Sequence, residues 1–264
     1  MNGTIHSKLL AASVLAAIVT TPLLAEQASS SSETQPVVVE LFTSEGCSSC
    51  PPADRVAIDL QNDLGSDLII LSEHVDYWNY LGWADPYSAP QFTSRQHDYA
   101  RKLGQQSVYT PEAIVDGTFG MVGSERGNLE SAIDRASRMP KVRVSISSSN
   151  AADDASKKEL DIRAVAPSGS AGTKAQLFVA VTENNLKSNV RSGENGGTVL
   201  EHTGVVRYLH KVGEAVRLED NKPISLNAEV RLDPRWKKQD LRIVAFFQDV
   251  STRAIRGANQ IKAN

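Results

Sequence analysis

The segment FTSEGCSSCPPAD, residues 42–54, contains Cys47 and Cys50, the two cysteines of this 264-residue chain. Two thiols separated by two residues can exchange disulfides, because one attacks as a thiolate and the other then displaces the mixed disulfide. Such a pair can instead bind a soft metal ion, or form a permanent structural disulfide. The pair by itself leaves these three kinds of chemistry open.

The residues on either side of the cysteines indicate what must position them. Residues 35–42, QPVVVELF, are a β-branched run that predicts a buried strand, and apolar residues at helical spacing after Pro51 predict a helix. Cys47 then lies just before a helix N-terminus, where unpaired amides and the helix dipole stabilise a thiolate. We expect Cys47 to be the attacking thiol and Cys50, one turn later, to be the shielded resolving thiol.

Further elements follow in an alternating order. The sequence predicts a strand over residues 67–78, then a loop rich in aromatic residues and a helix over residues 91–103. Two short strands are predicted around the turn at Asp116 and Gly117, a dipeptide favoured in tight hairpins. A last helix, in NLESAIDRASRM, completes the order β-α-β-α-β-β-α.

The second half of the chain has a different pattern. Short stretches of alternating polar and apolar residues, separated by polar turns, predict six or more strands without a helix over residues 140–264. We therefore expect two domains, an α/β domain over residues 35–139 and an antiparallel, sandwich-like β domain after it. In the second domain, Glu194, Asn195 and His202 are expected mainly to shape turns, with a position facing the thiols as the alternative.

The N-terminal segment indicates export. Lys8 precedes an apolar run over residues 9–25, shorter than the roughly 20 residues of a membrane span, so residues 1–25 are predicted to be a signal peptide and residues 26–34 a flexible linker. An uncleaved anchor is the alternative, because Leu23 is larger than the residues preferred near a cleavage site. Since no later segment is apolar enough to span, we expect a soluble periplasmic or secreted protein without a stable membrane span after cleavage.

The composition of the chain bears on its partners and on the role of its two cysteines. The formal net charge is -3, and no long basic stripe gives an electrostatic reason to expect nucleic acid as a partner. Two cysteines cannot form the dense disulfide framework of small secreted scaffolds, so the pair needs an explanation of its own. The sequence does not indicate an oligomeric state.

Two segments resemble the thioredoxin-like superfamily. They are the strand, CSSC and helix described above, and YTPEAIVDG, in which Pro111 precedes a short strand and a turn. The narrower resemblance is to DUF1223, a family of exported bacterial proteins of unknown function, and it is carried by LFTSEGCSSCPPAD, HVDYWNYLGW, VYTPEAIVDG and GENGGTVLEHTGVVRYL. The resemblance implies a thioredoxin-like fold for residues 35–139 and suggests thiol chemistry, but it supplies no established substrate. For a protein that exchanges disulfides, we expect exported protein or small-molecule thiols and disulfides as partners and no cofactor. Because Gly46 stands where thioredoxin has an aromatic residue, specificity and redox potential are not carried over.

The resemblance also implies roles for individual residues. A cis peptide bond before Pro111 would lie beside the cysteines, and Thr110 would offer backbone hydrogen bonds to an extended substrate. Glu40 would accept the proton of the resolving thiol, although it lies seven residues before Cys47 and the buried aspartate of thioredoxin lies six before. That offset matters because successive strand side chains point to opposite faces, and the alternative is a surface or salt-bridged glutamate.

The end of the second strand and the loop after it supply the remaining candidates. The carboxyl ends of parallel strands gather at one edge of a sheet, so this loop is expected to border the thiols. The expected contacts are Tyr77 and Trp78 with substrate, and Ser48, Ser49, His74 and Asp76 in support of the thiols. For His74 the alternative is a buried core histidine under the packed aromatic loop.

The sequence therefore favours an exported thiol–disulfide oxidoreductase, with the direction of exchange left open. One alternative is a copper or zinc protein that uses the two cysteines with His74 or His97. The lack of a methionine-rich or histidine-rich tract counts against it, as does a cysteine spacing one residue shorter than is usual in such copper proteins. The other alternative is a non-catalytic binding module whose disulfide is only structural.

Overall fold

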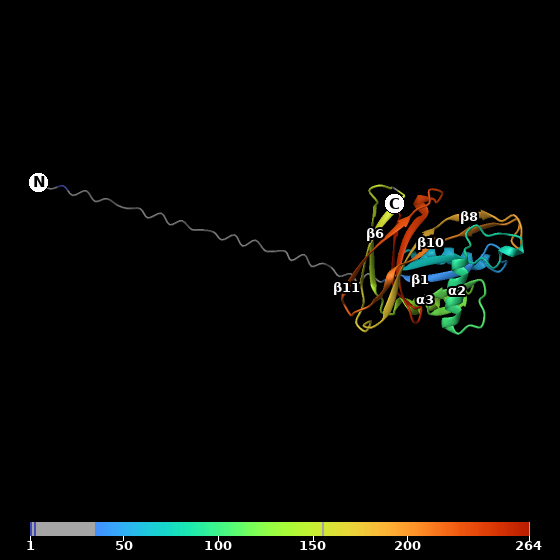
Figure 1. The fold of residues 1–264 in the computed structure, drawn as a ribbon, viewed down its shortest axis with the longest axis horizontal. Coiled ribbons are helices and arrows are strands. Elements are labelled where there is room, and N and C mark those ends of the chain that lie inside the picture. Colours follow the sequence, from blue (N-terminus) through green and yellow to red (C-terminus); the bar gives the residue numbers. More distant parts are fainter. Residues whose placement is uncertain (2, 4–34, 155, 264) are drawn as a thin grey trace. The chain divides into compact units, whose positions relative to one another are not determined.

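The computed structural model describes residues 1, 3, 35–154 and 156–263. The predicted signal peptide and linker lie, apart from residues 1 and 3, outside the described residues. From residue 35 onward the described chain forms one compact unit (Figure 1). Within these described ranges, no helix is both long and apolar enough to cross a membrane.

The first part of the unit alternates strands and helices. Pro51 occupies the first position of α1, where a missing N–H removes no intrahelical hydrogen bond, and Ala53, Ala57 and Leu60 bury one side of the helix. The elements are β1 (Val37–Thr43), α1 (Pro51–Leu64), η1 (Gly65–Asp67), β2 (Leu68–His74), η2 (Asn79–Leu81), α2 (Pro90–Leu103), β3 (Glu112–Val115), β4 (Phe119–Val122) and α3 (Arg126–Ser137). Their order is β-α-β-α-β-β-α, as the residue patterns predict.

The second part consists of strands and one short 3-10 helix. Alternating burial along β5 and β6 reflects strands with one face on a core and one in solvent. The elements are β5 (Arg143–Asn150), β6 (Lys157–Val165), β7 (Lys174–Glu183), β8 (Leu186–Asn189), β9 (Val199–His202), β10 (Val205–Arg217), β11 (Pro223–Arg231), η3 (Lys238–Asp240), β12 (Leu241–Asp249) and β13 (Ile255–Lys262).

One mixed sheet of eight strands runs through both parts, in the order β13-β12-β7-β10-β2-β1-β3-β4. The parts join where β10 pairs with β2 in parallel, at Val205 and Ser72. The hydroxyl and amide of Ser72 donate to the carbonyl oxygens of Thr203 and Gly204, at 2.7 and 2.8 Å. These bonds pair the backbone of β2 with the second part of the chain at Ser72. The segments that the sequence separates at residue 140 therefore share one sheet.

The second part has sandwich-like packing. A three-stranded antiparallel sheet, β11-β6-β5, packs against the antiparallel half of the large sheet. The core between them includes Leu160 and Ile162 of β6, Leu177 and Val179 of β7, and Ile243 of β12. Alternate residues of each strand point into this core. Strands β8 and β9 form a separate two-stranded sheet.

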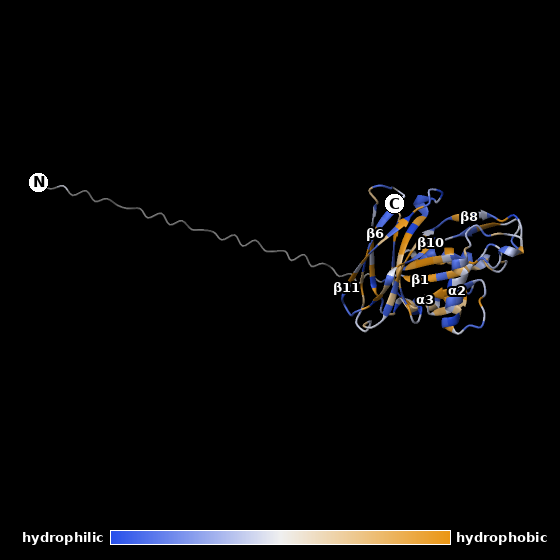
Figure 2. Ribbon diagram, in the orientation of Figure 1, coloured by the Kyte–Doolittle hydropathy of each residue, from blue (hydrophilic) through white to orange (hydrophobic). Residues whose placement is uncertain are grey.

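Helices cover both faces of the other half of the large sheet. Leu41 of β1 packs in a cluster with Leu60 of α1, whereas Phe42 of β1 packs in a cluster with Tyr99 of α2. Every residue of β1 is buried, and Figure 2 shows the apolar strands at the centre of the unit. Because β1 and β2 are parallel, the loops that follow them lie at the same edge of the sheet.

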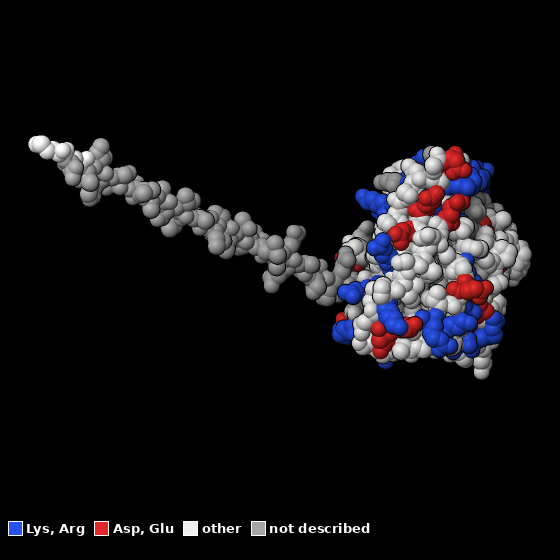
Figure 3. Space-filling model, turned by 60° about the vertical axis from the view of Figure 1, so that its left-hand side comes forward, with Lys and Arg blue, Asp and Glu red and all other residues white. Residues whose placement is uncertain are grey.

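Charged side chains of both signs share the surface. Lysine and arginine lie among aspartate and glutamate over the face shown in Figure 3. Exposed pairs include Arg126 with Asp63 and Glu130, at 2.6 and 2.7 Å. Such pairs contribute about 0–1 kcal/mol each, so the buried core accounts for most of the stability of the fold.

Candidate active site

The two cysteines form a disulfide in the turn between β1 and α1. Their Cα atoms are 5.4 Å apart, and Cys50 directly precedes the first turn of α1. The backbone amide of Cys47 donates to Ser44, and that of Cys50 donates to Cys47, each at 3.1 Å. Both cysteines are 0 % exposed, whereas Ser48 and Ser49 between them are exposed. The sulfur atoms thus lie at a helix N-terminus, covered by other residues.

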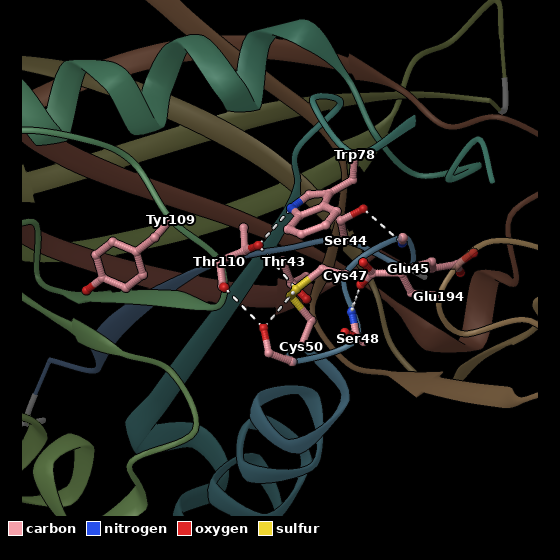
Figure 4. Close-up of a disulfide and its surroundings, with 12 residues drawn as sticks. Thr43, Ser44, Glu45, Cys47, Ser48, Cys50, Trp78, Tyr109, Thr110 and Glu194 are labelled. Atoms are coloured by element: carbon pink, nitrogen blue, oxygen red, sulfur yellow. Dashed lines mark hydrogen bonds between the residues drawn. A yellow bond between two sulfur atoms is a disulfide. The ribbon is translucent and has the colours of Figure 1, made fainter. Parts of the chain in front are cut away.

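Two hydroxyl groups lie against the sulfur of Cys47 (Figure 4). Thr110 Oγ1 donates to Cys47 Sγ at 3.2 Å, and Trp78 Nε1 donates to the same Thr110 oxygen at 2.8 Å. Because Trp78 occupies a lone pair of that oxygen, the hydroxyl hydrogen is free to point at the sulfur. Ser49 Oγ lies 3.3 Å from the sulfur and donates to the Thr110 carbonyl, also at 3.3 Å. The Thr110–Pro111 bond is cis, as the resemblance implies.

Tyr77 and Asp76 fasten the loop after β2 to α2. The hydroxyl of Tyr77 donates to Gln96 Oε1 at 3.2 Å, and burial raises the pKa of Tyr77 to about 12. The Asp76 carboxylate accepts a hydrogen bond from Thr93 Oγ1 at 2.5 Å. Of the loop residues expected at the thiols, Trp78 therefore reaches the site through Thr110, and the other two hold the loop that carries it.

Glu40 lies on the face of β1 that is opposite α1. Its carboxylate pairs with Arg95 Nε at 2.5 Å and accepts a hydrogen bond from the Tyr99 hydroxyl, and both partners belong to α2. Burial and the neighbouring Glu40 charge hold the pKa of Glu73, which also contacts Arg95, well above its usual value. The prediction that Glu40 accepts the proton of Cys50 is not supported, because the one-residue offset along the strand turns its side chain to the other face.

A buried polar cluster adjoins the disulfide turn. His202 of β9 places Nε2 3.3 Å from Glu45 Oε1 and Nδ1 3.5 Å from Asp54 Oδ2. His74 Nδ1 contacts Asp85 Oδ2 at 2.7 Å, and its ring packs edge-on against the ring of His202, with centroids 4.9 Å apart. The sequence pointed to His74 as a supporting residue, but the cluster as a whole was missed, because its members come from separate segments and no local pattern joins them.

Neighbouring groups shift the pKa values of His202 and Asp85 in this cluster. Burial lowers the pKa of His202, but the close carboxylates of Asp54 and Glu45 outweigh it and raise the value to about 10. Burial also raises the pKa of Asp85, and the nearby His74 ring outweighs it, so the value lies below the ordinary one. His202 is therefore an imidazolium at neutral pH and compensates for buried carboxylates.

Glu194 and Asn195 cover the disulfide turn. Asn195 Nδ2 donates to the carbonyl oxygens of Glu45 and Cys47, each at 2.9 Å, and Glu194 Oε2 accepts from the amide of Ser48 at 3.0 Å. The bond from Ser48 lowers the pKa of Glu194. These two residues thus take the alternative position, facing the thiols. The polar run GENGG was the signal in the sequence, although nothing in it identifies the turn that it contacts.

No metal-binding arrangement is present among the residues that the structure describes. Within them, no group of three histidine, cysteine, aspartate or glutamate side chains is placed to hold a metal ion. His97 is exposed on α2, and His74 Nδ1 is occupied by Asp85. The histidines considered for a site with the two thiols are therefore not assembled there.

Known proteins similar to this chain share its fold over most of its length. Residues 38–248 match a family described as a protein of unknown function (DUF1223). A structural-genomics crystal structure from Agrobacterium tumefaciens is 31% identical with a TM-score of 0.64, and the match covers 88% of this chain and 96% of that one. HBP35 of Porphyromonas gingivalis is 17% identical with a TM-score of 0.64, over 87% of this chain and 75% of that one, which indicates a shared fold alone. None of the curated proteins matches this chain.

Proposed function

We propose that this chain, which belongs to the family of proteins of unknown function DUF1223, is a thiol–disulfide oxidoreductase that acts through Cys47 and Cys50. Its main support is the pair of hydroxyl groups held against one sulfur atom. Thr110 and Ser49 come from separate segments, and their oxygens lie 3.2 and 3.3 Å from Cys47 Sγ. A disulfide that only staples a turn needs no hydrogen-bond donor on its sulfur, whereas the Thr110 hydroxyl, which donates to Cys47 Sγ, would stabilise a thiolate formed there.

The exchange takes place at Cys47. In the oxidising direction a substrate thiolate attacks Cys47 Sγ, a new S–S bond forms, and the bond to Cys50 breaks with its electron pair leaving on Cys50. A second substrate thiol, as its thiolate, then attacks the substrate sulfur of the mixed disulfide and releases Cys47 as a thiolate. The substrate dithiol loses two electrons and the protein pair gains them. The dipole of α1 and the Thr110 hydroxyl stabilise the released thiolate. The reducing direction is the same sequence reversed.

We also assign residues 35–139 to a thioredoxin-like arrangement, and the chain to an exported, periplasmic or secreted location. The order of the elements from β1 to α3, with the disulfide between β1 and α1, supports the first assignment. The apolar N-terminal segment supports the second, since disulfides persist in oxidising compartments. The partners are then exported protein or small-molecule thiols and disulfides.

Single-cysteine variants test the proposal. Reduced Cys50→Ala should form a stable mixed disulfide with oxidised glutathione, because no second thiol remains to resolve it. Reduced Cys47→Ala should form little or none. Intact-protein mass spectrometry measures the added glutathione in each variant. Equal labelling of the two variants, or no labelling of Cys50→Ala, would remove Cys47 as the attacking thiol.

A non-catalytic binding module with a structural disulfide is the second candidate. The complete burial of Cys47 and Cys50 favours it, because an attacking thiolate needs access to the sulfur. The two candidates differ in whether the disulfide of the native protein can be reached by a thiol.

A further inference from the structure

Trp78 lies directly against Gly46, the residue that precedes Cys47. A Cβ atom added to Gly46 would lie 3.0 Å from Trp78 Cβ and 3.4 Å from the Trp78 carbonyl oxygen. The first separation is shorter than an ordinary contact between carbon atoms, so a larger residue at position 46 would push Trp78 away. The glycine therefore lets the loop after β2 approach the backbone next to the sulfur of Cys47.

The indole N–H of Trp78 is aimed at the hydroxyl that contacts this sulfur. Trp78 Nε1 donates to Thr110 Oγ1 at 2.8 Å, and the same oxygen donates to Cys47 Sγ at 3.2 Å (Figure 4). The indole nitrogen thus lies no farther from Cys47 Sγ than these two distances together. An indole nitrogen carries one hydrogen and accepts none, so Trp78 can act on Thr110 only as a donor.

A threonine hydroxyl can turn about its C–O bond. Its hydrogen has about three staggered orientations, and one of them points at the sulfur. The N–H of Trp78 occupies a lone pair of Thr110 Oγ1 and polarises the hydroxyl, which leaves the hydrogen directed at Cys47 Sγ. The loop that carries Trp78 is itself fastened to α2 through Tyr77 and Asp76, so this arrangement exists before a thiolate forms.

We propose that Trp78 is a positioning residue for disulfide exchange, which holds the Thr110 hydroxyl as a donor to Cys47 Sγ. The inference rests on the proposed function and identifies what tunes the same site. When glutathione reduces the protein, two glutathione thiols become one glutathione disulfide. The protein disulfide gains their two electrons and two protons, one of which Cys47 releases when it ionises. The Thr110 hydroxyl stabilises the Cys47 thiolate of this reduced form, and Trp78 strengthens that stabilisation through Thr110.

The equilibrium constant of this reaction tests the proposal. The full chain is held in glutathione buffers of known composition, and its free thiols are counted by alkylation. Trp78→Phe keeps an aromatic ring and removes the N–H, so the hydroxyl regains its other orientations and the equilibrium should move toward the disulfide about threefold. Thr110→Val removes the hydroxyl itself and should move the equilibrium about tenfold. Trp236→Phe, at a half-buried tryptophan in the second part of the chain, is the matched control and should leave the equilibrium unchanged.

A double variant separates positioning from packing. In a Thr110→Val chain the indole has no hydroxyl to orient, so the addition of Trp78→Phe should cause no further change in the equilibrium constant. A change in packing around the disulfide would instead add its own effect in that background. An unchanged equilibrium in folded Trp78→Phe, or a further shift on top of Thr110→Val, would overturn the proposal.

Gly46→Ala provides a second variant, which keeps the indole and tests the same contact from the other side. The added methyl group would lie 3.0 Å from Trp78 Cβ and so displaces the indole from Thr110. The equilibrium should again move toward the disulfide, and this shift should disappear in the Thr110→Val background. Circular dichroism and thermal melting establish that each variant is folded. A shift that persists without the Thr110 hydroxyl would contradict the positioning role.

The outcome for Trp78 is separable from the outcome for the oxidoreductase. Glutathione captured by Cys50→Ala alone, together with a Trp78→Phe protein that matches wild type, would remove the positioning role and leave the oxidoreductase standing. A Trp78→Phe shift that depends on Thr110, together with equal glutathione labelling of the two single-cysteine variants, would leave the positioning role and remove the oxidoreductase.

Discussion

His202 Nδ1 lies 3.5 Å from Asp54 Oδ2, one helical turn beyond Cys50, and this contact ties the hairpin of β8 and β9 to the helix that begins at the disulfide. Nε2 of the same ring lies 3.3 Å from Glu45 Oε1, in the turn before Cys47. One imidazolium thus compensates for carboxylates on both sides of the disulfide turn. Because the second part of the chain supplies it, the site is complete only when the two parts fold together.

Replacement of His202 should cost stability. His202→Asn should lower the free energy of unfolding by about 3 kcal/mol, because Asp54 and Glu45 are left buried without a counter-charge. Urea unfolding followed by circular dichroism measures the change. His210→Asn, at an exposed position of β10, is the control and should change the value by less than about 0.5 kcal/mol. Similar losses in the two variants would contradict the role given to His202.

The same contact predicts a loss of stability at alkaline pH. The pKa of His202 is raised from 6.5 to about 10 in the fold, so between these values the native state holds a proton that the unfolded state has lost. The free energy of unfolding that the imidazolium contributes is fully present below pH 6.5 and is lost as pH rises through about 10. The difference in this free energy between wild type and His202→Asn should therefore shrink over that range in urea titrations. If the difference in unfolding free energy between wild type and His202→Asn stays constant over this pH range, His202 is not the group that loses the proton.

Glu40→Gln should leave thiol exchange unchanged. The Glu40 carboxylate pairs with Arg95 on the α2 face of β1, so its loss should cost about 2 kcal/mol of unfolding free energy without touching the thiols. Exchange with glutathione and urea unfolding, measured on the same preparation, separate the two effects. If the folded Glu40→Gln variant exchanges thiols more slowly than wild type, Glu40 takes part in the chemistry of the cysteines, which would contradict this prediction.

Thr110→Val should make the pair more reducing. The substitution keeps the size of the side chain and removes the hydroxyl that donates to Cys47 Sγ. A hydrogen bond to a thiolate stabilises the reduced form, so its loss should lower the midpoint potential by about 30 mV, which equals about 1.4 kcal/mol for this couple. Thr173→Val, at a half-buried threonine, is the control. A midpoint that rises or stays the same in Thr110→Val would mean that the hydroxyl does not act on a thiolate.

Local structure was predictable because short stretches of sequence determine it. The helix after the cysteines begins at Pro51 as predicted, and the run over residues 35–42 contains most of β1. The strand predicted over residues 67–78 ends earlier, at His74, because the chain then turns and the amide and carboxylate of Asp76 bind the Thr93 hydroxyl. The loop that starts there brings the aromatic residues to the site.

Contacts between distant segments were not predictable from local patterns. The pairing of β10 with β2 depends on backbone groups near Val205 and Ser72, which leave no periodic signal in the sequence. The position of His202 between two carboxylates follows from that pairing, because β9 directly precedes β10. For Glu40, a shift of one residue along a strand decided which helix its side chain faces.

An equilibrium redox titration of the purified protein in glutathione buffers, with the thiols followed by alkylation, tests the central claim most directly. A thiol–disulfide oxidoreductase should show a midpoint between about -120 and -270 mV, and the value also tells whether the pair tends to oxidise or reduce. A midpoint below about -300 mV would contradict the account, because Cys47 and Cys50 would then form a closed structural disulfide.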